Sequence, residues 1–208
     1  MRLILLHGLG QAPSAWEKTV GAMSMRERVA CPDLSDMLRG GEVSYPRLYR
    51  AFSEYCAAFS EPPALCGLSL GGILALHYAI GHPSGVRSLA LIGARMKMPK
   101  ALLAVQAAAF RLMPRSMFTQ TGFDKEAFLT LTSSMANLDF RGGAEKASFP
   151  ALILCGERDR ANRRAAVELA ERLPNAELRI VERAGHEVNI DAPEKLAGIL
   201  DAFFTARN

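Results

Sequence analysis

The chain has 208 residues, of which 50% are hydrophobic and 22% are charged. These proportions are typical of globular proteins and exclude a disordered or fibrous chain, and the length suffices for one domain with its own core. The net charge of +4 comes without a dense basic block, which argues against a nucleic-acid surface.

The chain has no apolar run that approaches the roughly 18 residues of a membrane span. The N-terminal run Leu3–Leu6 is too short for the core of a signal peptide, so we expect a cytoplasmic protein. The four cysteines form no CxxC pair, and we expect reduced, buried thiols rather than a metal site. The sequence also lacks a phosphate-binding glycine loop, so we expect no cofactor.

Short apolar runs alternate with segments of helical periodicity, which is typical of an α/β fold with a mainly parallel sheet and helices on both faces. In chain order, the expected elements are a strand over Arg2–His7, a helix over Ser14–Met25, a strand over Glu27–Cys31, a helix over Tyr45–Phe59, a strand over Pro63–Cys66, a helix over Leu70–Gly81, strands over Val86–Ile92 and Ala151–Cys155, a helix over Asn162–Leu173, a strand over Glu177–Val181 and a helix over Pro193–Thr205.

Two of the expected helices begin with capping signals. Ser14 and Glu17 have the spacing of a capping box, and Asp191 precedes the helix that Pro193 opens. The segment Leu70–Gly81 is apolar almost all round, which predicts a buried central helix.

One stretch, Arg95–Phe140, interrupts the alternation because it contains short helical pieces and no convincing strand. We interpret it as a helical lid, inserted at about residues 95–140 into a single domain of residues 1–208. Between Arg95 and Gly122 there are five basic residues and no acidic one. This pattern either attracts an anionic substrate or marks a solvated helix face.

The sharpest motif is Gly67-Leu68-Ser69-Leu70-Gly71, which lies between an apolar run and a strong helix. In that context a G-x-S-x-G pattern predicts a tight strand-to-helix turn with a strained backbone, in which the serine hydroxyl is lifted clear of the sheet. The alternative is an ordinary turn whose serine only caps the helix.

A second motif, His7-Gly8-Leu9-Gly10, follows the first strand. A glycine-rich turn there leaves backbone N–H groups free to stabilise an oxyanion, and the amides of Leu9 and Leu70 would form the pair. The alternative is a simple strand-to-helix connection.

Two further loops would bring an acid and a base to the same edge of the sheet. Cys155-Gly156-Glu157-Arg158-Asp159 follows the fifth strand, and Ala184-Gly185-His186-Glu187 follows the sixth. In open α/β sheets, ligands bind at the carboxyl ends of the strands. All four motifs fall at that edge, which favours a catalytic role for His186 over the structural role that is usual for an isolated histidine.

These motifs, in this chain order, resemble those of the α/β-hydrolase superfamily: a G-x-S-x-G elbow, an H-G oxyanion turn, a G-x-x-D acid loop and a late G-H. The resemblance covers essentially the whole chain apart from Arg95–Phe140. It implies that Ser69 is the nucleophile, that His186 is the general base and then the general acid, and that Asp159 orients His186. Glu157 is the alternative acid.

The sequence departs from the family pattern in two places. Members commonly have a P-D-x-x-G-x-G turn where this chain has Pro32-Asp33-Leu34-Ser35-Asp36-Met37, so one pocket wall is altered. Members usually have eight strands, whereas here the oxyanion turn begins at His7 and leaves no residues for the first two. We therefore expect an N-terminally shortened, all-parallel sheet of six strands in the order 2-1-3-4-5-6.

The residues and the resemblance together predict a serine hydrolase that cleaves a small or medium acyl ester through an acyl-Ser69 intermediate. The expected partner is a small-molecule acyl substrate, without nucleic acid or a membrane span. The alternatives are a thioesterase, a C–C hydrolase or an acyltransferase of the same fold, and a non-catalytic ligand-binding protein that retains the pocket.

The helical lid would supply the walls of the acyl pocket. We expect substrate contacts from Trp16, Met96, Phe110, Met113 and Met117; the alternative for each lid residue is that it packs the lid onto the sheet. Trp16 enters this set because some members of the family wall the pocket near its position; the alternative is that it covers the core from the first helix.

Overall fold

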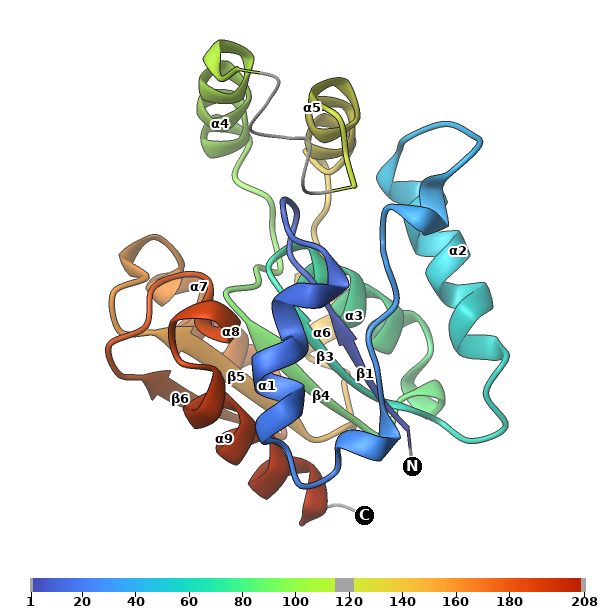
Figure 1. The fold of residues 1–208 in the computed structure, drawn as a ribbon, viewed down its shortest axis with the longest axis vertical. Helices are drawn as coiled ribbons and strands as arrows, with labels where there is room; N and C mark the ends of the chain where they lie inside the picture. The colour runs from blue at the N-terminus through green and yellow to red at the C-terminus, as the bar shows by residue number, and fades with distance from the viewer. Residues whose placement is uncertain (1, 115–121, 207–208) are drawn as a thin grey trace.

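The computed structural model describes residues 2–114 and 122–206, which form layers of helices on a central sheet (Figure 1). The strands are β1 (Leu3–Leu6), β2 (Val29–Ala30), β3 (Ala64–Leu68), β4 (Ser88–Ile92), β5 (Ala151–Gly156) and β6 (Ala176–Val181). They are ordered β2-β1-β3-β4-β5-β6, and each neighbouring pair is parallel. The predicted open parallel sheet and its strand order are confirmed.

The helices connect these strands and follow the last one. They are α1 (Glu17–Ala22), α2 (Tyr45–Ala57), α3 (Leu70–Gly81), α4 (Lys100–Leu112), α5 (Lys125–Ser134), α6 (Arg141–Ala144), α7 (Arg160–Arg172), α8 (Val188–Asp191) and α9 (Pro193–Thr205). Within the described residues, none of the helices combines the length and the apolar character needed to cross a bilayer.

The sheet is buried on both faces because successive side chains of a strand point to opposite sides. In β1, Leu3 and Leu5 belong to the core beneath α1 and α9, where Phe203 packs. Ile4 and Leu6 belong to the opposite core, which α2, α3 and α7 cover. The continuous apolar runs in the sequence follow directly from this two-sided burial.

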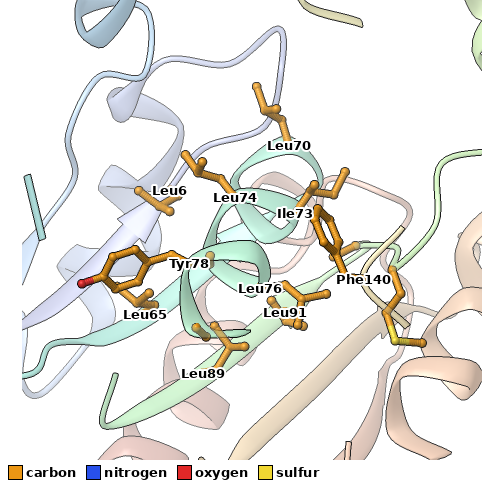
Figure 2. Close-up of a cluster of buried hydrophobic side chains, with 14 of the residues drawn as sticks. Leu6, Leu65, Leu70, Ile73, Leu74, Leu76, Tyr78, Leu89, Leu91 and Phe140 are labelled. Atoms are coloured by element: carbon orange, nitrogen blue, oxygen red, sulfur yellow. The ribbon is translucent and has the colours of Figure 1, made fainter. Parts of the chain in front are cut away.

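Helix α3 is the central helix of the fold, as the sequence predicts. Leu74 and Leu76 are fully buried, and the side chains of this helix lie over Leu65, Leu89 and Leu91 of the sheet (Figure 2). Because α3 starts directly after β3, its position fixes the residue at the turn between them.

The two predicted helix caps are wrong. Pro13–Trp16 forms a 3-10 turn, and α1 begins only at Glu17, so Ser14 makes no capping hydrogen bond. Burial of Trp16 at the junction accounts for the break, because its ring is taken into the core. Asp191 does not cap α9 either, since it ends α8 and its Oδ2 accepts a hydrogen bond from Gly185 N, 2.6 Å away.

Helices α4 and α5 stand together at one end of the molecule (Figure 1), and the end of α5 meets the start of α2, where Tyr45 N donates to Ser134 Oγ at 2.9 Å. Their segment is closed at its base by backbone hydrogen bonds from Phe140 N to Met96 O at 2.8 Å and from Met98 N to Leu138 O at 3.1 Å. In the described part of this segment only an isolated antiparallel bridge, between Lys97 and Asp139, has strand-like pairing. The sheet therefore stays all-parallel.

Candidate active site

Ser69 occupies the turn between β3 and α3 in a backbone conformation that is rare for residues other than glycine, with φ 51° and ψ −111°. A Cβ atom on Gly67 would collide with the backbone of Gly71, and one on Gly71 would collide with the carbonyl of Leu6. The Ser69 amide donates a hydrogen bond to Ile92 O at 2.8 Å. The glycines of the motif are thus required by close backbone packing, as the G-x-S-x-G pattern predicts.

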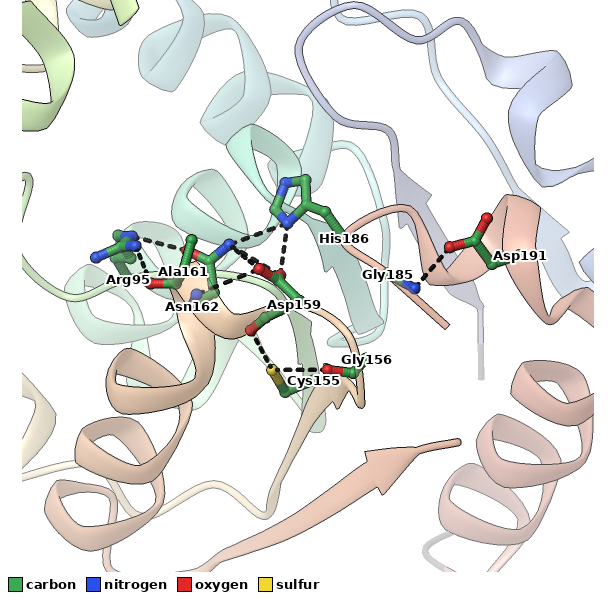
Figure 3. Close-up of polar contacts among 9 residues, drawn as sticks. All are labelled: Arg95, Cys155, Gly156, Asp159, Ala161, Asn162, Gly185, His186 and Asp191. Atoms are coloured by element: carbon green, nitrogen blue, oxygen red, sulfur yellow. Dashed lines mark hydrogen bonds and ion pairs between the residues drawn. The ribbon is translucent and has the colours of Figure 1, made fainter. Parts of the chain in front are cut away.

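Asp159 and His186 come from the loops after β5 and β6 and meet at the carboxyl edge of the sheet. The distance between His186 Nδ1 and Asp159 Oδ2 is 2.8 Å (Figure 3). The side chain of Asp159 is 4% exposed and that of His186 is 40% exposed, so the imidazole lies between a buried carboxylate and the open site. Glu157 instead accepts a hydrogen bond from Arg183 N at 2.8 Å, so Asp159 is the acid that contacts the histidine.

The charge of Asp159 is stabilised where it is buried. Burial by itself raises the pKa of this carboxyl, but hydrogen bonds from His186 and Asn162 outweigh that effect, and the pKa is lowered. Asp159 also begins α7, because its carboxylate accepts a hydrogen bond from the amide of Asn162 at 3.2 Å. A single carboxylate thus caps a helix and holds the imidazole.

Gly93, directly after β4, is part of the site although the sequence analysis did not single it out. Its φ is +57°, and a Cβ atom there would lie 2.8 Å from both Nδ1 and Cε1 of His186. The space that the imidazole occupies therefore depends on a residue without a side chain. A glycine immediately after a predicted strand was the available signal.

The amides proposed for the oxyanion pair, those of Leu9 and Leu70, belong to residues that line the same cavity as Ser69. Leu70 is the first residue of α3, where an α-helix leaves its N–H groups without intrahelical partners. Leu9 lies in the turn after β1, and the preceding amide, Gly8 N, donates to Gln11 Oε1 at 3.3 Å.

A buried amide pair connects this turn to the loop that carries His186. Gln11 Nε2 donates to Asn189 Oδ1 at 3.3 Å, and Asn189 Nδ2 donates back to Gln11 Oε1 at 3.2 Å. Gln11 Nε2 also donates to Glu187 Oε1 at 2.9 Å. The sequence analysis missed these residues, because nothing in their local spacing shows that Gln11 and Asn189 meet.

His7 has a structural position in the turn after β1. It is fully buried, its Nε2 accepts a hydrogen bond from Leu34 N at 3.0 Å, and its Nδ1 lies 3.0 Å from Gly8 O. These two bonds require a neutral ring with the proton on Nδ1. Burial lowers the pKa of His7, which is consistent with that neutral form.

The site opens into a cavity of about 380 Å³ between the sheet edge and the helices α4 and α5. Ser69, His186 and Asp159 all line it. The other lining residues are mostly apolar: Leu9, Leu70, Ile73, Gly93, Arg95, Met98, Pro99, Leu103, Phe110, Phe128, Thr132, Met135, Ala161 and Asn162. The cavity can therefore bind an apolar group next to the serine hydroxyl.

Of the residues predicted to contact the substrate, Phe110 lines this cavity. Trp16 does not, because it is fully buried in the core beneath α1 and α9, and Met96, which is 2% exposed, packs in the opposite core. Met113, just after α4, is not among the described residues that line the cavity. Met117 lies outside the described residues.

Among residues 2–114 and 122–206, no three or more His, Cys, Asp or Glu side chains are grouped closely enough to hold a metal ion. The chemistry available at the cavity is that of a serine hydroxyl, an imidazole with a carboxylate partner, and backbone N–H donors.

Comparison with known proteins places this arrangement in a family. Residues 3–199 match the profile of the alpha/beta hydrolase family. The pimeloyl-[acyl-carrier protein] methyl ester esterase of Aeromonas hydrophila subsp. hydrophila is 28% identical over 97% of this chain and 94% of that protein. A monoacylglycerol lipase of Bos taurus is 22% identical over 98% of this chain and 75% of that protein.

Solved structures share the fold. A carboxylesterase from the thaumarchaeon Nitrososphaera gargenis superposes with a TM-score of 0.82 at 20% identity and covers 99% of this chain and 90% of its own. The enol-lactonase from Burkholderia xenovorans LB400 superposes with a TM-score of 0.83 at 20% identity, over 98% of this chain and 91% of its own. With the parallel sheet and the serine elbow already described, the profile match over nearly the whole chain shows that the protein belongs to the alpha/beta hydrolase family.

Proposed function

We propose that this protein is a serine hydrolase that cleaves carboxylic esters with a small or medium acyl group through an acyl-Ser69 intermediate. The observation that carries the proposal is the His186–Asp159 hydrogen bond of 2.8 Å on the cavity that Ser69 lines from its strained turn. A turn that served only to cap α3 would need neither this backbone strain nor the adjacent acid–base pair.

The reaction follows from the roles that these groups can take. His186 Nδ1 is engaged with Asp159, so Nε2 is the nitrogen that takes the proton of the Ser69 hydroxyl as its oxygen attacks the ester carbonyl. The amides of Leu9 and Leu70 stabilise the tetrahedral oxyanion. The C–O bond to the alcohol then breaks, and His186 returns the proton to the leaving oxygen.

Deacylation repeats these steps with water. His186 takes a proton from the water as it attacks the acyl-Ser69 carbonyl, and then gives the proton to the serine oxygen as the carboxylic acid leaves. Asp159 stays ionised throughout and stabilises the imidazolium form of His186. The lowered pKa of Asp159 supports this role.

The acyl class is supported by the cavity and by the relatives. Its apolar walls include Leu103 and Phe110 of α4 and Phe128 of α5, and they suit a hydrocarbon chain. The relatives compared above are named for ester hydrolysis. We place α4 and α5 as a lid that belongs to the same domain as the sheet and that selects the acyl group.

The test combines labelling with turnover. A fluorophosphonate probe should label Ser69, and a panel of p-nitrophenyl esters should be hydrolysed with a preference for small or medium acyl chains. Ser69→Ala should lose labelling and turnover while it unfolds at an unchanged or higher temperature. Turnover by Ser69→Ala at the wild-type rate would overturn the assignment, and a wild type that is not labelled would favour the non-catalytic ligand-binding alternative.

Varying the leaving group separates the remaining alternatives. Matched oxygen esters, thioesters and C–C substrates with one acyl chain distinguish an esterase from a thioesterase or a C–C hydrolase. Transfer of the acyl group to an added alcohol faster than to water would identify an acyltransferase.

A further inference from the structure

The carboxylate of Asp159 receives most of its hydrogen bonds from one residue that the mechanism above does not use. Asn162 Nδ2 lies 2.9 Å from Oδ1 and 2.8 Å from Oδ2 of Asp159, and the Asn162 backbone N lies 3.2 Å from Oδ1 (Figure 3). His186 shares Oδ2. Asn162 is buried, so these contacts are shielded from water and their directions matter.

The orientation of the Asn162 amide is fixed from its other side. Arg95 Nε donates to Asn162 Oδ1 at 2.8 Å, and Arg95 Nη2 donates to the carbonyl of Ala161 (Figure 3). A guanidinium can only donate, so the amide oxygen must face Arg95 and the NH₂ group must face Asp159. The contacts form a chain from Arg95 through Asn162 to Asp159 and His186.

The same amide group borders the imidazole. Asn162 Nδ2 lies 3.1 Å from His186 Nδ1, and both nitrogens point at Asp159 Oδ2. If the amide were rotated by half a turn, its oxygen would face the carboxylate, and the two acceptors would repel each other. This repulsion would disturb the hydrogen bond between His186 and Asp159. The position of the ring thus depends on which way the amide points.

We propose that Asn162, oriented by Arg95, is a positioning residue that fixes the Asp159 carboxylate and through it the imidazole of His186 for proton transfer. This inference rests on the proposed function and adds two residues to it. Two further titratable or charged groups lie close by: the Cys155 thiol of β5 donates to the backbone carbonyl of Asp159 at 3.6 Å, and Arg163 of α7 interacts with Cys155.

The expected effects follow from charge. Asn162→Leu removes the side-chain donors, so the carboxylate becomes more basic and holds the imidazolium form of His186 more strongly. The acid limb of kcat/KM and of fluorophosphonate labelling should move to higher pH, on the order of half a unit. We also expect kcat to fall roughly tenfold or more, because the ring loses its fixed position.

Two substitutions at Arg95 separate charge from orientation and leave the α7 cap intact. Arg95→Gln removes the cation and should move the acid limb in the same direction. Arg95→Lys keeps the charge but cannot donate to the Asn162 amide and the Ala161 carbonyl at the same time. We therefore expect kcat to fall while the acid limb stays near its wild-type pH. Arg164→Gln is the matched control, because it removes an exposed cation from the same part of the molecule and should change neither quantity.

The experiment is a set of pH–rate profiles for turnover and for labelling of the 208-residue chain, with thermal unfolding measured for each variant. The inference would be overturned if the acid limb of both Asn162→Leu and Arg95→Gln stayed at the wild-type pH, whatever the activity of the two variants. A merely structural role lowers activity without moving the acid limb. If the wild type is labelled and active, that failure concerns only these two residues. If the wild type is not labelled, the proposed function fails and the inference fails with it.

Discussion

The cavity has two walls that are built in different ways. On the sheet side, Ser69 and Gly93 directly follow β3 and β4, and Asp159 lies in the short loop between β5 and α7. Backbone geometry or several hydrogen bonds fix each of them. On the other side, α4 and α5 contribute side chains such as Phe110 and Phe128, whose rings meet edge-on at 4.6 Å.

The two sides also differ in burial. Helix α3 is buried along most of its length, whereas α4 exposes Val105 at 68% and Leu112 at 88%. A group fixed by a buried strand end keeps its position to within the tolerance that catalysis needs, while an exposed helix can change its side chains at little cost in stability. We infer that the sheet edge determines the reaction and that α4 and α5 determine the substrate.

The largest expected effect comes from the acid at the sheet edge. Asp159→Asn should lower kcat by about 10⁴-fold, because an amide favours the wrong tautomer of His186. The cap of α7 should remain, since asparagine also caps helices well. The control is Glu157→Gln, which should stay near wild-type kcat on a p-nitrophenyl ester; a larger loss in the control than in Asp159→Asn would reverse the assignment.

A smaller loss of kcat is expected at Gly93, which leaves space for the imidazole but does not bind it. Gly93→Ala adds a methyl group 2.8 Å from the His186 ring at a φ of +57°. We expect kcat to fall by about 10²-fold through displacement of the ring, together with a destabilisation of about 1 kcal/mol. Gly142→Ala, where a Cβ would meet nothing within 4 Å, is the matched control in both kinetics and thermal unfolding. Equal kinetics in the two variants would show that the ring has room to move.

On the helical wall, a substitution should change selection rather than chemistry. Phe110→Ala should lower kcat/KM for medium-chain esters about tenfold and leave acetate esters nearly unchanged. Leu112→Ala, on the same helix but 88% exposed, serves as the control. If Phe110→Ala lowered kcat equally for every acyl chain length, the inference that α4 and α5 determine the substrate would be wrong.

The smallest effect concerns stability and pH. His7 is buried as the neutral ring and its pKa is lowered, first by burial, so below about pH 6.5 the unfolded chain binds a proton that the folded chain does not. The stabilisation is therefore complete above that pH and is lost as the pH falls below it. His7→Gln should reduce this slope in urea unfolding measured between pH 7 and 5. An identical slope in the variant would assign the pH dependence to other groups.

The fold was predictable where burial and backbone constraints act together. The bounds of α3 and α9 match the predicted ranges, because an apolar segment between Ser69 and Gly81 and a proline at position 193 delimit them. The first helix was not predicted correctly, because the burial of Trp16 is a tertiary effect that capping signals do not contain.

The site divides in the same way. Ser69, Asp159 and His186 could be found because each belongs to a short motif at the end of a strand. Asn162 and Arg95 could not, since their contact joins residues 67 positions apart, between the start of α7 and the segment after β4. The lining of the cavity was the least predictable part, because it depends on how α4 and α5 are placed.

The strained backbone at Ser69 has a consequence for any attempt to improve this protein. Glycine adopts a φ of 51° without steric strain, so Ser69→Gly should raise the free energy of unfolding by about 1 kcal/mol while it removes the proposed nucleophile. Selection for thermal resistance alone would therefore favour an inactive variant at this position. A screen of random variants should therefore measure ester turnover after heating, because stability and the proposed activity favour different residues at position 69.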